Sequence, residues 1–156
     1  MIDFMLVVNR QGKLRMSRWY GSLMLAQRDS LSKSVTEVVL ARSPKSPQIL
    51  EHKGHRVLYR RYASLFFIMG IKRAAVSGED DDENELLVLE WIHRFVETLD
   101  AYFGNVCELD LIFNYSKAFA IWDEMVVGGR LVESSSRLIV NNIFAIDERI
   151  ECESKK

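Results

Sequence analysis

Apolar residues at the start of the chain follow the pattern of paired strands. Residues 2–8 form an apolar run of strong β formers, and a turn over residues 9–12 separates them from an alternating run that begins at Leu14. Two such runs around a short polar turn predict a β-hairpin. Over residues 22–42 the apolar spacing becomes helical, and Pro44 ends this predicted helix. Its inward face is predicted to hold Leu31, Val35, Val38 and Val39.

Three further strands are predicted in the next part of the chain. They cover residues 49–52, 55–60 and 62–71. The last of these is a near-continuous apolar run, which suits a strand that is buried on both faces. We interpret Arg60 and Arg61 as the turn between the last two strands, where long basic side chains extend into solvent. The alternative for this basic pair is a direct role in binding an anion.

The pattern breaks at residues 72–84, which read KRAAVSGEDDDEN. Few apolar groups and five acids bury little surface, so we predict a mobile loop. Three helices are predicted after it, over residues 88–102, 108–127 and 135–146, and residues 148–156 form a polar tail.

The predicted order of elements is therefore ββαβββααα. Strands that are joined by hairpins form an antiparallel sheet, and the helices must cover its faces. The pattern predicts one α/β domain over residues 1–147, with a five-stranded antiparallel sheet flanked by helices in a longin-like, or profilin-like, arrangement.

Composition narrows the possible partners. The chain has 156 residues, of which 48% are hydrophobic and 28% are charged, and its net charge is -1. This globular composition has no overall basic field, which argues against nucleic acid and against direct binding to an anionic membrane. No apolar run is long enough to span a bilayer, and two cysteines outside any CxxC pair fit a reducing, cytoplasmic location.

Candidate catalytic and metal sites are weak. Neither GxxxxGK nor GxGxxG occurs in the sequence. His52 and His55 have no cysteines nearby, and we interpret them as exposed turn histidines rather than metal ligands. A triad of Cys107, His93 and Asp110 is the alternative, but Cys107 lies in the apolar-rich run VCELDLIF, which predicts burial, and buried cysteines are usually inert. We therefore expect no enzyme, no catalytic residue, no metal site and no cofactor.

Four segments together resemble one protein family. They are MIDFMLVVNRQGKLRMSRWY (1–20), VVLARSPK (38–45), YRRYASLFF (59–67) and FGNVCELDLIFNYSKAFAIWDEMVVGG (103–129). In these segments the chain resembles the small, or sigma, subunit of the clathrin-associated adaptor complexes, most of all the subunit of the trans-Golgi network and endosome complex. The resemblance extends to about residue 146. It departs at the loop 72–84, which is longer than usual, and at GSLMLAQ (21–27), which is more apolar.

The resemblance implies a non-enzymatic subunit of a heterotetramer. In this family a small subunit of longin-like fold packs mainly against one large adaptin chain, in a complex with a medium chain and a second large chain. Clathrin and an Arf-type GTPase are implied as partners only through the complex, and membrane contact is indirect. The implied location is the cytoplasmic side of trans-Golgi network and endosome membranes and of clathrin-coated vesicles.

The resemblance also implies recognition of acidic dileucine sorting signals in the cytoplasmic tails of membrane cargo. In these signals an acidic residue precedes two large aliphatic residues. Arg15 matches the family's contact for the acidic residue, beside an arginine of the large chain. The positions that match the leucine pocket are Ala63, Leu65, Val96, Asn105, Val106 and Leu111. In the predicted fold Ala63 and Leu65 share one face of a strand, and the other positions come from a helix, a turn and the next helix, so the set can converge on an apolar trough.

Another longin-type trafficking module without dileucine recognition is the alternative, such as a SNARE longin domain or a tethering-complex subunit. We do not expect a SNARE, because a SNARE continues into a heptad segment and a membrane anchor whereas this sequence stops at Lys156.

Overall fold

The computed structural model describes residues 2–72, 82–132 and 135–155. Its centre is a five-stranded sheet. The strands are β1 (Ile2–Asn9), β2 (Leu14–Trp19), β3 (Ile49–His52), β4 (His55–Tyr62) and β5 (Leu65–Lys72). Neighbouring strands run antiparallel in the order β2-β1-β5-β4-β3, which confirms the predicted antiparallel sheet of a longin-like domain.

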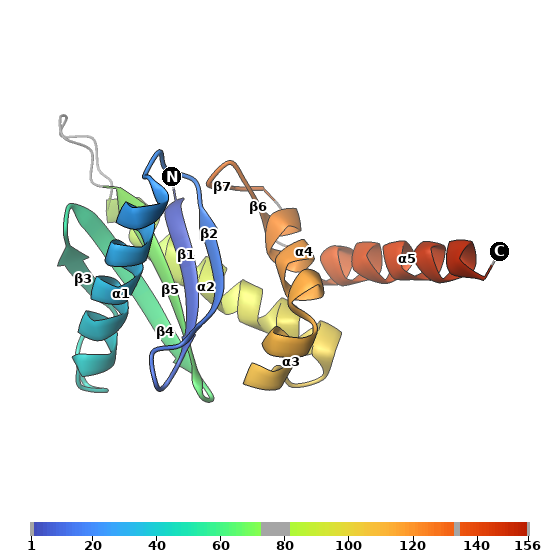
Figure 1. Ribbon diagram of the computed structural model, residues 1–156, viewed down its shortest axis with the longest axis horizontal. Coiled ribbons are helices and arrows are strands. Elements are labelled where there is room, and N and C mark those ends of the chain that lie inside the picture. The colour runs from blue at the N-terminus through green and yellow to red at the C-terminus, as the bar shows by residue number, and fades with distance from the viewer. Residues whose placement is uncertain (1, 73–81, 133–134, 156) are drawn as a thin grey trace.

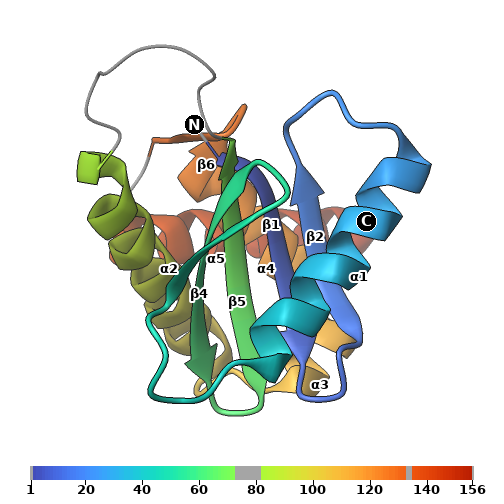
Figure 2. The same ribbon diagram turned by 90° about the vertical axis from the view of Figure 1, so that its left-hand side faces the viewer.

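Helices lie on both sides of this sheet. They are α1 (Leu25–Ala41), α2 (Asp82–Phe103), α3 (Glu108–Phe113), α4 (Tyr115–Met125) and α5 (Ser136–Ser154). A small two-stranded sheet of β6 (Val126–Val127) and β7 (Arg130–Leu131) follows α4. Figure 1 and Figure 2 show α1 alone on one side of the large sheet, and α2, α4 and α5 on the other.

The interior strand β1 separates two apolar cores. All eight of its residues are buried, and successive side chains of a strand point to opposite faces. Phe4 and Leu6 pack in the core beneath α1, together with Val35. Met5 and Val7 instead join the larger core beneath α2 and α4. The apolar run of β1 therefore reflects helices on both faces.

Gly70 on β5 gives the ring of Phe4 the space that it occupies. A Cβ atom at Gly70 would lie 2.2 Å from two ring carbons of Phe4, and that ring is fully buried. Real Cβ atoms do not approach so closely in a close-packed core, so the β1–β5 pairing at this point requires glycine.

A polar cluster anchors α5 to the body of the domain. Tyr102 on α2 donates its hydroxyl hydrogen bond to Asp147 Oδ2 at 2.8 Å, and Lys117 on α4 forms an ion pair with Oδ1 of the same carboxylate. Ile143 and Ile139 add buried apolar contacts one and two turns earlier. Beyond these contacts the C-terminal half of α5 projects away from the sheet (Figure 1).

The structure corrects the interpretation of the two adjacent arginines. Arg60 and Arg61 lie inside β4, and Tyr62 pairs with Leu65, so the turn between β4 and β5 consists of Ala63 and Ser64. Ala63 adopts a left-handed φ of 51°, and the Arg61 Nε donates a hydrogen bond to its carbonyl at 3.3 Å. The expectation that Ala63 and Leu65 share one strand face is also wrong, because Ala63 belongs to the turn.

Helix boundaries differ from the predicted ones in the second half of the chain. The predicted helix over residues 108–127 is two helices, because Asn114 has φ −120° and ψ 36° and both ends α3 and begins α4. Its last two residues form β6, which turns through the left-handed Gly128 and Gly129. In the first half, α1 begins at Leu25 rather than at residue 22.

The polar tail and the predicted loop also need correction. Helix α5 continues to Ser154, because residues 148–154 contain no glycine or proline and a polar composition does not by itself end a helix. At the edges of the predicted loop, Lys72 belongs to β5 and residues 82–84 belong to α2. The rest of that loop, residues 73–81, lies outside the described residues.

Candidate functional site

Three chain segments meet at one end of the sheet, at the lower edge of Figures 1 and 2. These are the β1–β2 turn, the β4–β5 turn and α3, and we call this region the α3 end. The sheet register supports the placement, because Asn9 pairs with Leu65 at this end of β1 whereas Ile2 pairs with Ile71 at the other end. The residues that the sequence suggested for the binding site come from these segments, from the strand ends and the loop that adjoin them, or from the C-terminal half of α2.

Asp100, near the end of α2, holds two of these segments together. Its Oδ2 accepts a hydrogen bond from the Tyr62 hydroxyl at 2.6 Å, and its Oδ1 accepts one from the Val106 backbone N–H at 2.8 Å. Gly104 and Asn105 both take left-handed φ angles, 66° and 72°, which lets the chain reverse after α2. The hydrogen bond to Asp100 raises the pKa of Tyr62, so the phenol remains a donor at neutral pH.

A second polar cluster ties the β1–β2 turn to the start of α3. Asn9 is 4% exposed, and its Oδ1 accepts hydrogen bonds from the backbone N–H groups of Gln11 and Lys13, each at 2.9 Å. Its Nδ2 donates to Glu108 Oε1 at 2.8 Å. Each of the three bonds uses a different orbital or hydrogen of one buried amide, so the amide is well satisfied.

Arg15 binds the same carboxylate oxygen. Its Nε donates to Glu108 Oε1 at 2.8 Å, and its Nη2 lies 2.7 Å from that oxygen. The hydrogen bonds from Asn9 and Arg15 lower the pKa of Glu108, so this carboxylate is ionised at neutral pH. The positive charge of Arg15 is thus offset within the chain by Glu108.

The predicted leucine-pocket residues lie at the α3 end in two distinct environments. Ala63 and Asn105 are exposed on two neighbouring turns. The four apolar residues are members of the larger core, with exposures of 0% for Leu65, 6% for Val96, 4% for Val106 and 1% for Leu111. Leu65 pairs with Asn9 across β1 and β5, the backbone of Val106 donates to Asp100, and Val96 lies one helical turn before Asp100. The structure therefore brings the set together, with its apolar members covered.

Neither of the candidate histidines at the β3–β4 turn is exposed, which contradicts the expectation. The Nε2 of His55 lies 2.6 Å from Asp3 Oδ2, and the side chain is 10% exposed. The Nε2 of His52 lies 2.5 Å from Ser34 Oγ, and burial lowers the pKa of His52. Both rings are therefore occupied by contacts within the fold. No cluster of metal-ligating side chains occurs among residues 2–72, 82–132 and 135–155.

The conceivable triad is not assembled. His93 on α2 pairs through Nε2 with Glu97, one turn further along the same helix, at 3.1 Å. Cys107 is exposed at the start of α3, which contradicts its expected burial, and its backbone N–H donates to Asp110 Oδ2 at 3.0 Å. Asp110 therefore caps a helix end and His93 has a different carboxylate partner.

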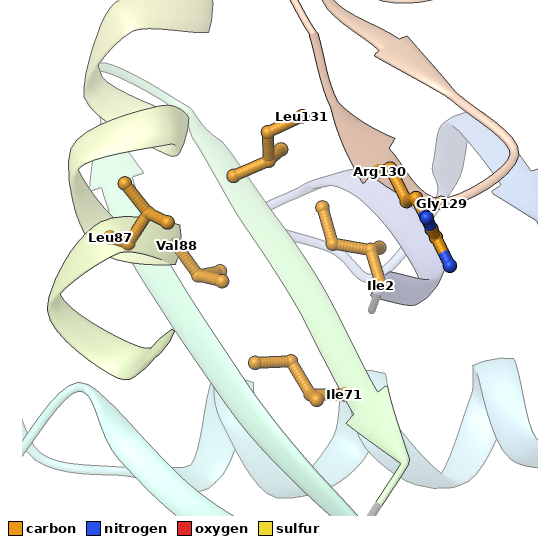
Figure 3. A pocket seen from close by; sticks show the side chains of 7 residues that line it. All are labelled: Ile2, Ile71, Leu87, Val88, Gly129, Arg130 and Leu131. Atoms are coloured by element: carbon orange, nitrogen blue, oxygen red, sulfur yellow. The ribbon is translucent and has the colours of Figure 1, made fainter. Parts of the chain in front are cut away.

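An apolar cavity lies at the opposite end of the sheet from the α3 end. It has a volume of about 350 Å³ and is lined by Ile2, Ile71, Leu87, Val88, Gly129, Arg130 and Leu131. In Figure 3 Leu87 and Val88 on α2 face Ile2 and Leu131 across the opening. Among the described residues that line the cavity, Arg130 is the one ionisable group, so these residues offer no pair of groups for acid–base chemistry.

Sequence reasoning missed three residues that organise the α3 end, namely Asn9, Asp100 and Glu108. An asparagine before a turn is a recognisable signal, because its side chain often binds the backbone N–H group two residues on. The partners of Asp100 and Glu108 had no such local signal. Asn9 and Glu108, for example, are separated by 99 positions in the chain.

Comparison with known proteins agrees with this fold over nearly the whole chain. A family model described as the clathrin adaptor complex small chain matches residues 1–150. The AP-1 complex subunit sigma-1 of Schizosaccharomyces pombe is 44% identical over 155 residues, covering 99% of this chain and 91% of that protein. The AP-1 complex subunit sigma-2 of Arabidopsis thaliana is 46% identical, covering 97% and 88%. The AP-2 complex subunit sigma of Dictyostelium discoideum is 45% identical, covering 94% and 98%.

A similar architecture occurs in a structure described as a homology model of the full-length AP-3 complex in a stretched open conformation. One of its chains superposes with a TM-score of 0.74 at 26% sequence identity, and the match covers 99% of this chain and 98% of that one. None of the helices in the described part of the chain has an apolar stretch long enough to cross a membrane. Sequence and structure together show that the chain belongs to the clathrin adaptor complex small chain family.

Proposed function

We propose that this protein is the small subunit of a heterotetrameric clathrin adaptor complex, where it stabilises the complex core and binds acidic dileucine sorting signals of membrane cargo. The observation that carries the proposal is the composition of the α3 end. An arginine, two exposed turns and four clustered apolar residues from three parts of the chain meet there. A signal with an acid ahead of two aliphatic residues presents the complementary chemistry.

Leucine side chains can reach the apolar residues only if the covering turns separate. Val96 and Val106 retain 6% and 4% exposure, so they are the members nearest to solvent. The hydrogen bonds of Asp100 to Tyr62 and Val106 hold the cover in place. Burying one leucine stabilises a complex by roughly 1.5–3 kcal/mol, which exceeds the roughly 1 kcal/mol that a net hydrogen bond contributes. Displacement of this cover by two leucines is therefore energetically feasible.

A large adaptin chain is the proposed main partner, with a medium chain and a second large chain completing the complex. The relatives are named as sigma subunits of AP-1 and AP-2 complexes, which supports membership of such an assembly. On α5 the stripe of Ile139 and Ile143 continues as Ile146 and Ile150, which are 46% and 55% exposed on the projecting half. An apolar stripe that leaves the body of its own domain suits a helical surface of another chain.

The proposed location follows from the complex rather than from any membrane segment. Similarity to AP-1 subunits favours trans-Golgi network and endosome membranes and clathrin-coated vesicles, reached from the cytoplasmic side. Clathrin and an Arf-type GTPase are proposed as partners through the other subunits. The role is non-enzymatic, and the protein requires no cofactor for it.

Substitutions at the two most accessible pocket valines test the proposal. Val96→Asp and Val106→Ser in the assembled complex are expected to lower the affinity for an acidic dileucine peptide at least tenfold, because both remove apolar contacts from the leucines. Peptide titration by fluorescence anisotropy measures the effect. Val88→Asp is the matched control, since Val88 is a 4% exposed valine at the far end of the same helix. Unchanged binding by Val96→Asp and Val106→Ser complexes would refute the pocket.

The second candidate is a longin-type trafficking module that assembles without reading dileucine signals. Burial of Leu65 and Leu111, at 0% and 1% exposure, favours this role, because closed apolar residues serve packing equally well. An intact complex that binds no dileucine peptide at all would establish it.

A further inference from the structure

Glu108 presents Arg15 with the same group that a sorting signal would present. Its carboxylate oxygen Oε1 accepts the Nε and Nη2 groups of Arg15 at 2.8 Å and 2.7 Å. It reaches this position as the first residue of α3, three residues before Leu111 and two after Val106. The carboxylate of Glu108 is therefore already bound to the guanidinium of Arg15, close to the predicted leucine-pocket residues.

We propose that Glu108 is a built-in competitor for the acidic residue of the sorting signal, which has to exchange with Glu108 on Arg15. This inference rests on the proposed function and concerns the selectivity of the same site. While Glu108 neutralises Arg15, the guanidinium itself offers an incoming acid little net positive charge. The preference of the site for an acid is then set by the difference between two free energies: that of the incoming carboxylate binding to Arg15, and that of Glu108 binding to Arg15.

The surroundings allow this exchange without leaving Glu108 unpaired. The side chains of Arg15 and Glu108 are 24% and 26% exposed, so a peptide carboxylate can approach the guanidinium from solvent. Glu108 has a second holder in Asn9, whose amide is fixed by two backbone hydrogen bonds of the β1–β2 turn. The ammonium of Lys13 also stabilises the ionised form of Glu108. Glu108 can thus release Arg15 while it keeps a hydrogen-bond donor and a nearby cation.

The test is Glu108→Gln in the assembled complex. Glutamine keeps an oxygen acceptor for Asn9 and Arg15 and removes the negative charge. Affinity is measured by titration for two peptides that differ only in glutamate or glutamine at the acidic position of the signal. We expect Glu108→Gln to increase the preference for the glutamate peptide about fivefold, near the upper limit for a partly exposed ion pair. The affinity for the glutamine peptide should stay the same.

Two controls separate local competition from other effects. Asp123→Asn removes the same charge from another partly exposed arginine pair, Arg18–Asp123 at 2.8 Å, and should leave the preference unchanged. In an Arg15→Ala background, Glu108→Gln should no longer alter the preference, because the contested group is absent.

The results distinguish a competitor role of Glu108 from a positioning role, from a general electrostatic effect and from a failure of the dileucine function itself. A preference that stays constant or falls in Glu108→Gln would overturn the competitor and make Glu108 a residue that only positions Arg15. An equal rise in Asp123→Asn would overturn it in favour of a general field effect. If the wild-type complex binds neither peptide, the proposed dileucine function fails, and the competitor falls with it. If wild type binds both and only the Glu108 result is flat, the dileucine function survives.

Discussion

Ala63 shows how a single residue shapes the edge of the candidate site. It turns the chain between β4 and β5 with a φ of 51°, a region that suits glycine and costs other residues about 1–2 kcal/mol. A methyl group at this position is exposed, so it gains little from burial in return. The turn therefore stores backbone strain directly before Leu65, a residue of the proposed pocket.

Replacing Ala63 with glycine should therefore stabilise the domain. We expect Ala63→Gly to raise the free energy of unfolding by about 1 kcal/mol, because glycine adopts left-handed φ angles without a Cβ clash. Urea unfolding at low protein concentration, followed by tryptophan fluorescence, measures the change. Ser64→Gly, at the next turn position, has no left-handed φ to relieve and should destabilise. A lower urea midpoint for Ala63→Gly would show that the turn is unstrained.

Residue-scale features were the hardest to predict from the sequence. The basic pair at residues 60–61 looked like a turn, because two charges interrupted an apolar run. The register of β4 with β5 instead places the turn at Ala63 and Ser64. The position of a turn is fixed by the pairing between strands, which the local sequence does not encode. Glu108 and Asp100 were missed because their partners are remote in sequence.

At the scale of elements, helices and strands were predicted where the apolar period is long and regular. The five strands and α1 and α2 follow directly from such periods. The break at Asn114 was hidden, because apolar spacing continues through it from α3 into α4. The length of α5 was underestimated for the opposite reason, since its last turns are polar although they remain helical.

The polar cluster on α5 gives its attachment a dependence on pH. Burial, followed by the hydrogen bond to Asp147, raises the pKa of Tyr102 to about 12. Burial opposes ionisation of Asp147, but the hydrogen bonds from Lys117 and Tyr102 outweigh it, so the pKa of Asp147 lies below its ordinary 3.8. The stabilisation from Asp147 is therefore present above pH 3.8 and is lost as the pH falls through the lowered pKa. That from Tyr102 is present below pH 10 and is lost as the pH rises through about 12.

Asp147→Asn tests this attachment. We expect it to lower the free energy of unfolding by about 1 kcal/mol at neutral pH, because the ion pair with Lys117 is lost and is partly exposed. The deficit should shrink as the pH falls below 3.8, where wild type also loses the charge. Urea titrations across this pH range measure both effects. Glu148→Gln, on the outer side of α5, is the control, and a deficit independent of pH would contradict the assignment.

At the scale of the whole molecule, the sequence predicted the fold correctly, but it could not predict which apolar residues are exposed on the surface. The antiparallel sheet between helices follows from apolar periods and hairpin turns alone. Which apolar residues remain exposed depends on where α5 leaves the body, and no pattern within one helix specifies that. Leu25 and Ile150 are aliphatic, yet they are 77% and 55% exposed.

Exposed aliphatic residues predict how the isolated chain behaves. We expect the chain to aggregate when it is produced alone at high concentration, and to dissolve when it is produced with a large adaptin chain. Ile146→Ser combined with Ile150→Ser should reduce this aggregation and also weaken co-purification with the large chain. Light scattering and affinity purification measure the two effects.

The control for this pair lies on the opposite side of the same helix. Asn141→Ser combined with Glu148→Ser alters two exposed residues of α5 without touching the isoleucine stripe, and it should leave assembly unchanged. A monodisperse wild-type monomer at high concentration, or full assembly by the isoleucine variant, would show that the stripe is not part of the partner surface.

The ring of Phe4 fills the space that a side chain at position 70 would need, and this sets the order in which the two positions can be substituted during evolution. A lineage cannot first acquire a methyl group at position 70, because the ring already fills that space. Phe4 has to be replaced by a smaller residue first, and each intermediate protein must stay folded with a cavity in its core. Of the two positions, 4 is the one free to vary first, and 70 can only follow.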